Sequence, residues 1–270
     1  MADSSIPLLT ALQAFDGGAT PTALQAVAGV ENRDVDRFLR QALDEGSVRE
    51  HAPGRYELVS AAASLSNTSE VALARSRHAE YFAEWACEHG AEIDVLESEL
   101  PNLQAGLKTA CAGPTPRDDL VILYAATVVN LFLIRQRWDS ALSWLQEAVA
   151  ACERQRDDEM LARVYTRIGL THCLRGSFQP GYDWYAKAAP IFERSNDKAE
   201  LATIEGNLGL IALALSDTRA EAHLRKSATL SSQLGTRSRD AQIVEHALVL
   251  LITRGWDEAA SFARSRLTAA

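Results

Sequence analysis

Arg137-Trp138-Asp139-Ser140-Ala141 is the first of three similar stretches that decide the fold of this chain of 270 residues. The second is Gly176-Ser177-Phe178-Gln179-Pro180, and the third is Gly255-Trp256-Asp257-Glu258-Ala259. Each is a tight turn followed by the start of a helix. Phe178 lies 40 residues after Trp138, and Trp256 follows about two periods later. A period of this length predicts stacked helix pairs that bury their apolar faces against one another.

Apolar residues at helical spacing predict about four helix pairs in residues 118–270. These are 118–136 with 138–155, 158–175 with 178–195, 198–215 with 219–234, and 238–253 with 255–268. Two of the first helices carry Ile168-Gly169 and Leu208-Gly209, again 40 residues apart, where a small residue lets paired helices approach closely. The pattern resembles the tetratricopeptide repeat in its longer form. That resemblance implies a mainly α fold with a right-handed superhelix of helix pairs.

Residues 1–60 have the pattern of a small winged-helix domain. We expect three helices followed by two short strands that meet at a Pro53-Gly54 turn. The helices are predicted at 6–15, at 20–27 with Thr20-Pro21 at its start, and from Asn32 to about 45, and the strands at 47–50 and 55–58. Residues 59–68 are small and polar, and we interpret them as a linker or as the lead into the next helix. Linking helices are expected in 61–117, at 69–89 and around Leu100 to Leu107, before the repeat array of 118–270.

Three stretches of the front half resemble the region that follows the ATPase core in bacterial signal-transduction ATPases, which are related to maltose-regulator-like transcription activators. They are Leu8-Leu9-x-Ala11-Leu12-x-Ala14-Phe15-x-Gly17-Gly18, Arg77-His78-Ala79-x-Tyr81-Phe82 and Leu96-Glu97-x-Glu99-Leu100-x-Asn102-Leu103-x-Ala105-x-Leu107. In that family a winged helix and then a helical-repeat sensor follow the nucleotide-binding module. The resemblance, over about residues 6–235, therefore implies a regulatory region. ATPase activity is not implied, because the chain lacks a glycine-rich phosphate loop ending in Gly-Lys-Ser/Thr.

The charge of the chain disfavours nucleic acid as a partner. The formal net charge is −9, whereas affinity for nucleic acid depends mainly on Lys and Arg side chains that neutralise phosphates. In the predicted third helix, Arg33, Arg37 and Arg40 are outnumbered by neighbouring acids. We therefore interpret the winged helix as a packing module. A DNA-binding transcription regulator with a repeat sensor is the alternative.

Nothing in the sequence predicts export or a membrane span. The start of the chain lacks the basic and apolar regions of a secretory signal. The most apolar run, 120–134, is shorter than the ~20 residues that a spanning helix needs. The chain has four widely spaced cysteines, which we expect to be reduced and buried thiols: Cys87, Cys111, Cys152 and Cys173. We expect a cytoplasmic protein.

No catalytic or metal-binding constellation is apparent in the sequence. It contains no His-Glu-x-x-His, no nucleophile elbow and no Cys/His cluster with metal-ligand spacing. His172 and Cys173 are adjacent, but neighbours on a helix point about 100° apart, so they do not form a dyad by themselves. We expect no catalytic residues, no cofactor and no enzymatic activity.

The groove of the repeat array is the predicted binding site. First helices of repeat pairs line such a groove, which would place there Arg163, Thr166, Arg167, Thr203, Asn207 and Asn130. Guanidinium groups beside amides could hold a carboxylate or a peptide backbone. In the competing interpretation, Arg163 and Arg167 pair with Asp158 and Glu159 or face water.

These observations predict a non-enzymatic regulatory or adaptor module, part of or partner to a signalling ATPase. Its groove would bind a protein or peptide, or else a small effector. The final helix ends near Arg266-Leu267 without an evidently polar cap. Because terminal repeats need a polar outer face, we expect further repeats, a partner or self-association at this end.

Overall fold

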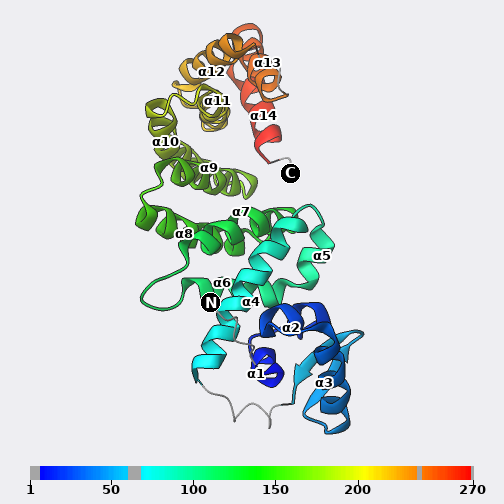
Figure 1. The fold of residues 1–270 in the computed structure, drawn as a ribbon. Helices are drawn as coiled ribbons and strands as arrows, with labels where there is room; N and C mark the ends of the chain where they lie inside the picture. The colour runs from blue at the N-terminus through cyan, green and yellow to red at the C-terminus, as the bar shows by residue number, and fades with distance from the viewer. Residues whose placement is uncertain (1–6, 60–67, 236–238, 269–270) are drawn as a thin grey trace. The chain divides into compact units, whose positions relative to one another are not determined.

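The computed structural model describes residues 7–59, 68–235 and 239–268. These residues form 14 helices and one two-stranded sheet (Figure 1). The expectation of a mainly α helical-repeat fold is confirmed. The chain divides into two compact units. The boundary between them falls after Leu131, inside helix α7 (Asp118–Ile134). The predicted domain boundaries at residues 60 and 117 stay predictions.

The first unit begins with three helices and a hairpin, in the predicted order. They are α1 (Leu8–Leu12), α2 (Pro21–Ala28), α3 (Asn32–Asp44), β1 (Val48–Ala52) and β2 (Arg55–Leu58). The Thr20 hydroxyl caps α2 by accepting a hydrogen bond from the Ala23 amide at 3.2 Å. Gly54 turns the antiparallel hairpin with a φ of 71°, which glycine adopts without steric cost. An apolar cluster centred on Leu24, Val27 and Val35 holds these elements together.

Two details of this region differ from the sequence prediction. α1 stops at Leu12 rather than Phe15, because Ala14 and Phe15 bond three residues back and tighten the chain into turns. Asn32 is the first residue of α3 and not its cap, which is Glu31. The start of the predicted first helix at residue 6 and most of the predicted linker, 60–67, lie outside the described residues.

The rest of the first unit is formed by α4 (Thr68–Glu88), α5 (Ile93–Ser98), α6 (Leu100–Cys111) and the start of α7. α5 was not predicted, because a helix of six residues has too short an apolar pattern. Pro101 lies in the first turn of α6, where its missing amide hydrogen costs nothing. His78 lies inside the unit, against the rings of Phe15 and Phe82, and burial lowers its pKa to about 4.

Asn102 of α6 ties the N-terminal elements to the linking helices. It is fully buried, and its Oδ1 accepts hydrogen bonds from the amides of Asp16 and Gly17, both at 3.2 Å. Its Nδ2 donates to the Gly18 carbonyl at 3.2 Å and to Glu99 at 2.8 Å. Glu99 also forms an ion pair with Arg55 of β2. One buried side chain therefore satisfies the polar groups of the turn after α1.

The second unit contains the helices of the predicted repeat array that follow α7. They are α8 (Trp138–Gln155), α9 (Asp158–Leu174), α10 (Phe178–Arg194), α11 (Lys198–Ala214), α12 (Ala220–Leu234), α13 (Arg239–Thr253) and α14 (Trp256–Leu267). The three aromatic residues of the repeated stretches each begin a helix. Asp157 and Asp197 cap α9 and α11 by accepting amide hydrogen bonds at 2.9 and 3.1 Å.

The repeated glycines lie where paired helices touch. A Cβ on Gly169 would lie 2.8 Å from the Tyr185 ring and 3.2 Å from the Gly181 carbonyl oxygen. A Cβ on Gly209 would lie 2.6 Å from Leu224. Two helix pairs, α9 with α10 and α11 with α12, therefore pack so closely that a residue larger than glycine would not fit at positions 169 and 209. The close approach at these positions was predicted from the repeated glycines.

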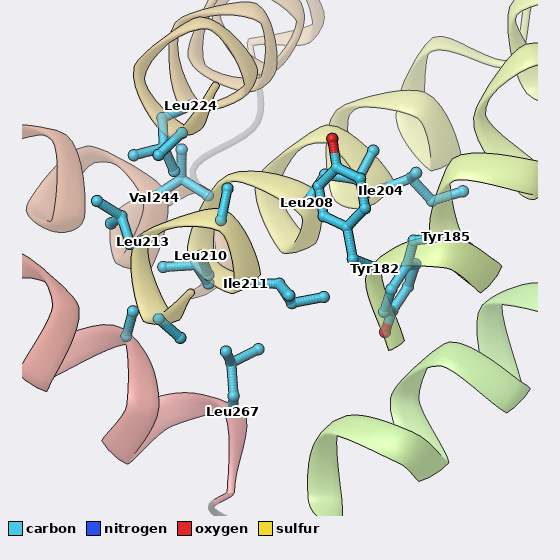
Figure 2. Close-up of a cluster of buried hydrophobic side chains, with 14 of the residues drawn as sticks. Tyr182, Tyr185, Ile204, Leu208, Leu210, Ile211, Leu213, Leu224, Val244 and Leu267 are labelled. Atoms are coloured by element: carbon cyan, nitrogen blue, oxygen red, sulfur yellow. The ribbon is translucent and has the colours of Figure 1, made fainter. Parts of the chain in front are cut away.

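α14 returns across α11 instead of packing on α13 alone. The Arg264 guanidinium donates to the Ala214 carbonyl at the end of α11, at 3.0 and 3.3 Å. Figure 2 shows Leu267 of α14 pointing toward α11, near Leu210 and Ile211. α11 is consequently buried on nearly all sides and becomes the centre of the core of this unit.

The cysteines are all unpaired, but only two are buried. Cys152 and Cys173 are buried, Cys111 is half-buried and Cys87 is exposed. The prediction that all four are buried was wrong for Cys87, because position 87 falls on the outer face of α4 next to Glu84 and Glu88.

Candidate functional site

The predicted groove residues fall in both units. Asn130 lies half-buried on α7 in the first unit. The other five lie in the second unit, Arg163, Thr166 and Arg167 on α9 and Thr203 and Asn207 on α11. Because α9 and α11 belong to the same unit, the distances between their side chains can be described.

Arg163 bridges α9 and α11 through ion pairs. Its guanidinium donates to Glu159 at 3.0 Å and to Glu200 at 2.9 Å, and lies 3.9 Å from Asp197. The pair with Glu159 is the one that the competing interpretation expected, whereas Asp158 lies 3.3 Å from Arg194. Because the Arg163 side chain is 43% exposed, these pairs are screened by water and stabilise the unit little.

Thr166 and Arg167 continue the same face of α9. The Thr166 hydroxyl donates to the Ala162 carbonyl one turn back, at 3.0 Å, so its proton is already used. Arg167 is half-buried. Neither residue lines the cavity described next, and nor does Arg163.

A cavity of about 310 Å³ adjoins α11, and we call it the α11 cavity. It is lined by residues of six helices, α9 to α14, and is partly open to solvent. Thr203 and Asn207 of α11 both line it, so the structure brings these two predicted residues together at one hollow. The Thr203 hydroxyl donates to the Ala199 carbonyl at 3.2 Å. The Asn207 carboxamide forms no hydrogen bond with any described residue and is available to a ligand.

Most of the wall of the α11 cavity is apolar. Leu170 and Leu174 of α9, Leu210 of α11 and Val244 of α13 supply aliphatic surface. The polar residues that sequence reasoning missed are Ser227 and Ser231 of α12 and Arg266 of α14. No local signal marks them, because they reach the cavity only through the packing of α12 and α14 on α11. Ser227 is already bonded to the Ala202 carbonyl at 2.7 Å.

Cys173 lines the cavity but is a poor nucleophile. Burial raises the pKa of its thiol to about 12, so the thiolate is absent near neutral pH. Within the described parts of the chain, no three His, Cys, Asp or Glu side chains are grouped so that they could hold a metal ion. The cavity therefore presents an apolar wall together with the Asn207 carboxamide and the Arg266 guanidinium.

A second polar cluster joins α10, α11 and α12 away from the cavity. Glu205 is only 4% exposed, and its carboxylate lies 2.7 Å from His223 Nδ1 and 2.9 Å from Lys226 Nζ. The other ring nitrogen of His223 lies 2.9 Å from the Tyr182 hydroxyl. Burial raises the pKa of Tyr182, so this hydroxyl stays protonated near neutral pH. None of these residues lines a described cavity, and we interpret the cluster as structural.

Comparison with known proteins shows a shared fold. No protein-family model and no curated protein sequence matches the chain. Among solved structures, BtubC from P. vanneervenii matches with a TM-score of 0.51 and 15% identity over 91% of this chain and 87% of that one. A signal transduction ATPase with numerous domains and a tetratricopeptide repeat sensor, from Pyrococcus horikoshii, matches with a TM-score of 0.43 and 11% identity, over 96% of this chain and 49% of that one. At 15% identity the likeness to BtubC concerns the fold alone.

No helix in the described ranges combines the length and the apolar character needed to cross a membrane. The longest apolar run of the sequence lies in α7, whose Tyr124 and Phe132 are buried by protein instead.

Proposed function

We propose that this chain is a non-enzymatic regulatory or adaptor module that binds a protein, peptide or small effector at the α11 cavity. The observation that carries the proposal is the meeting of Thr203 and Asn207, two residues predicted from the repeat pattern, at one hollow. The free carboxamide of Asn207 adds a group that can donate and accept hydrogen bonds there. The sequence resemblance to sensor regions of signalling ATPases supports a regulatory role.

A bulky side chain at Thr203 is expected to block the cavity and to reduce binding at least tenfold. Thr203→Phe would fill the hollow from α11, whereas Thr229→Phe would place the same ring on the exposed face of α12. Thr229 is a matched control, because its hydroxyl also bonds to a carbonyl one turn back. Each tagged full chain would be incubated with lysate of the source organism, and retained proteins and small molecules would be identified by mass spectrometry.

Two readouts make this experiment decisive. Circular dichroism first shows whether both variants remain as helical as the unchanged chain. A molecule that is retained by wild type and Thr229→Phe but lost from Thr203→Phe supports the proposal. Equal retention by all three proteins contradicts the proposal, and retention of nothing rules out a protein or peptide partner.

We propose further that α1–α3 and the hairpin are a winged helix used for packing. The bonds of Asn102 and the Arg55–Glu99 pair support this role, because they attach the turn after α1 and the hairpin to α6. DNA binding has no comparable support. On α3, Arg33 lies 2.7 Å from Glu31 and Arg37 lies 2.8 Å from Asp34, so acids on the same surface offset these charges.

Self-association through the C-terminal end of the array is a third proposal. Val249 and Ile252 of α13 are 54% and 61% exposed, which is unusual for large aliphatic side chains. A second copy that covers them would make the molecular mass rise with concentration. We expect light scattering to show this rise for the full chain and to show a monomer for Val249→Glu/Ile252→Glu. A wild-type monomer at high concentration would rule out the proposal.

A further inference from the structure

The α11 cavity has the size of a small-molecule site. Its volume of about 310 Å³ lies at the lower end of the range found for ligand pockets. A folded peptide helix is much larger than this hollow, which therefore suits one compact molecule.

The walls of the cavity require an occupant with an apolar body. Leu170, Leu174, Leu210, Leu234, Ile243 and Leu267 line it from five helices. Two of the polar side chains in the wall have used their donors on backbone carbonyls, Thr203 on Ala199 and Ser227 on Ala202. Burying apolar ligand surface here is favourable, whereas a sugar or another polyol would lose hydrogen bonds to water.

The charged side chain that lines the cavity is positive. Arg266 of α14 lines it, and no described Asp or Glu does. The Arg266 guanidinium lies 5.3 Å from the centre of the Phe262 ring and forms no ion pair or hydrogen bond with a described residue. Its neighbour in the helix, Arg264, is by contrast bound to the Ala214 carbonyl. In a chain of net charge −9, a cation that pairs with no described acid and lies at an apolar hollow favours an anionic ligand.

We propose that the α11 cavity binds a small monocarboxylic acid with a branched aliphatic or aryl body. Arg266 holds the carboxylate, because guanidinium donors match its planar oxygens. The Asn207 amide donates a further hydrogen bond from α11, and the body fills the space between α9 and α13. The inference rests on the proposed function, since it takes the small effector as the occupant of the same site.

Matched acids and amides test the inference by titration calorimetry on the full chain. The probes are 4-methylpentanoate and phenylacetate, each beside its own amide, which has the same body without the charge. We expect wild type to bind each acid at least tenfold tighter than its amide. Arg266→Gln should bind acid and amide within about threefold of each other. Arg266→Lys keeps the charge and should retain part of the preference for the acid.

The control is Arg225→Gln, which removes an exposed arginine of α12 that pairs with Glu221 and does not line the cavity. It should behave as wild type. Thermal unfolding by circular dichroism shows whether Arg266→Gln is folded, and Asn207→Leu offers an independent variant, expected to weaken acid binding at least threefold.

Three results would overturn the inference: equal binding of acid and amide by wild type, an acid preference that survives in Arg266→Gln, or no binding of either probe class. These results differ from a failure of the proposed function. If Thr203→Phe abolishes capture of a protein while no acid binds, the module still acts through the cavity and only the ligand class is wrong. If acids bind as expected and nothing is captured from lysate, the ligand class stands without a macromolecular partner.

Discussion

Replacing Gly106 of α6 by alanine is expected to lower the free energy of unfolding by about 3 kcal/mol. The new Cβ would lie 1.9 Å from the Tyr124 hydroxyl oxygen and 2.7 Å from its ring carbon Cζ. Tyr124 is fully buried, and its hydroxyl donates to the Ala79 carbonyl at 2.8 Å, so the ring cannot move without losing that bond. The clash outweighs the gain in helix propensity from glycine to alanine, which is about 1 kcal/mol.

A double-mutant cycle isolates the contact. Tyr124→Phe alone should cost about 1 kcal/mol, the usual net value of one hydrogen bond. In Gly106→Ala/Tyr124→Phe the nearest atom of the clash is gone, so the double variant should be more stable than the sum of the single effects by at least about 1 kcal/mol. Urea unfolding followed by circular dichroism measures each value. Gln104→Ala, on the exposed side of α6, serves as the control and should change stability by less than about 0.5 kcal/mol.

Strict additivity in this cycle would contradict the packing of α6 against α7. The same result would remove the reason for glycine at this position, because no other described side chain lies so near to its missing Cβ.

Removing the buried carboxylate of Glu205 is expected to cost about 3 kcal/mol at pH 7. Glu205→Ala leaves His223 without its acceptor, leaves Lys226 without one of two carboxylates, and opens a void beside α12. Glu193→Ala is a matched control, because Glu193 pairs with the same Lys226 at 3.2 Å but is 62% exposed. Its loss should cost less than about 0.5 kcal/mol.

The effect of Glu205 should depend on pH in one direction. Burial alone would raise its pKa, but the hydrogen bonds from His223 and Lys226 outweigh burial, and the pKa is lowered from the ordinary value of 4.5. A carboxyl whose pKa is lowered in the folded state stabilises the fold above the unfolded pKa and loses that contribution as the pH falls through the folded pKa. The difference between wild type and Glu205→Ala in urea unfolding should therefore be full above about pH 5.5 and shrink below 4.5. A difference that grows on acidification would contradict the geometry of this cluster.

The periodic part of the fold could be read from local sequence because its signals are local. Trp138, Phe178 and Trp256 each begin a helix, as the turn preceding each of them indicated. Gly169 and Gly209 lie at close helix contacts because only a residue without a Cβ fits there. α5 was not predicted, because its six residues form less than two helical turns and are too few to show the spacing of apolar residues that marks a helix.

The candidate site could be predicted only in part. Thr203 and Asn207 follow from the repeat, because the face of a first helix is set by its own spacing. The ion pair of Arg163 with Glu200 joins side chains 37 residues apart, and nothing in the spacing of either helix indicates it. Arg266 could not have been chosen from the sequence, where it is one of several arginines near the end of the chain.

The sequence by itself determined the mainly α class, the order of the elements and the period of the array, because helix starts, caps and small residues act over a few neighbouring positions. Only the tertiary structure decided that α14 lies across α11, that Arg266 and Asn207 share one cavity, and that Glu205 meets His223. These contacts depend on the distances and crossing angles at which helices pack, which result from the fit of many side chains at once and leave no mark at any single position.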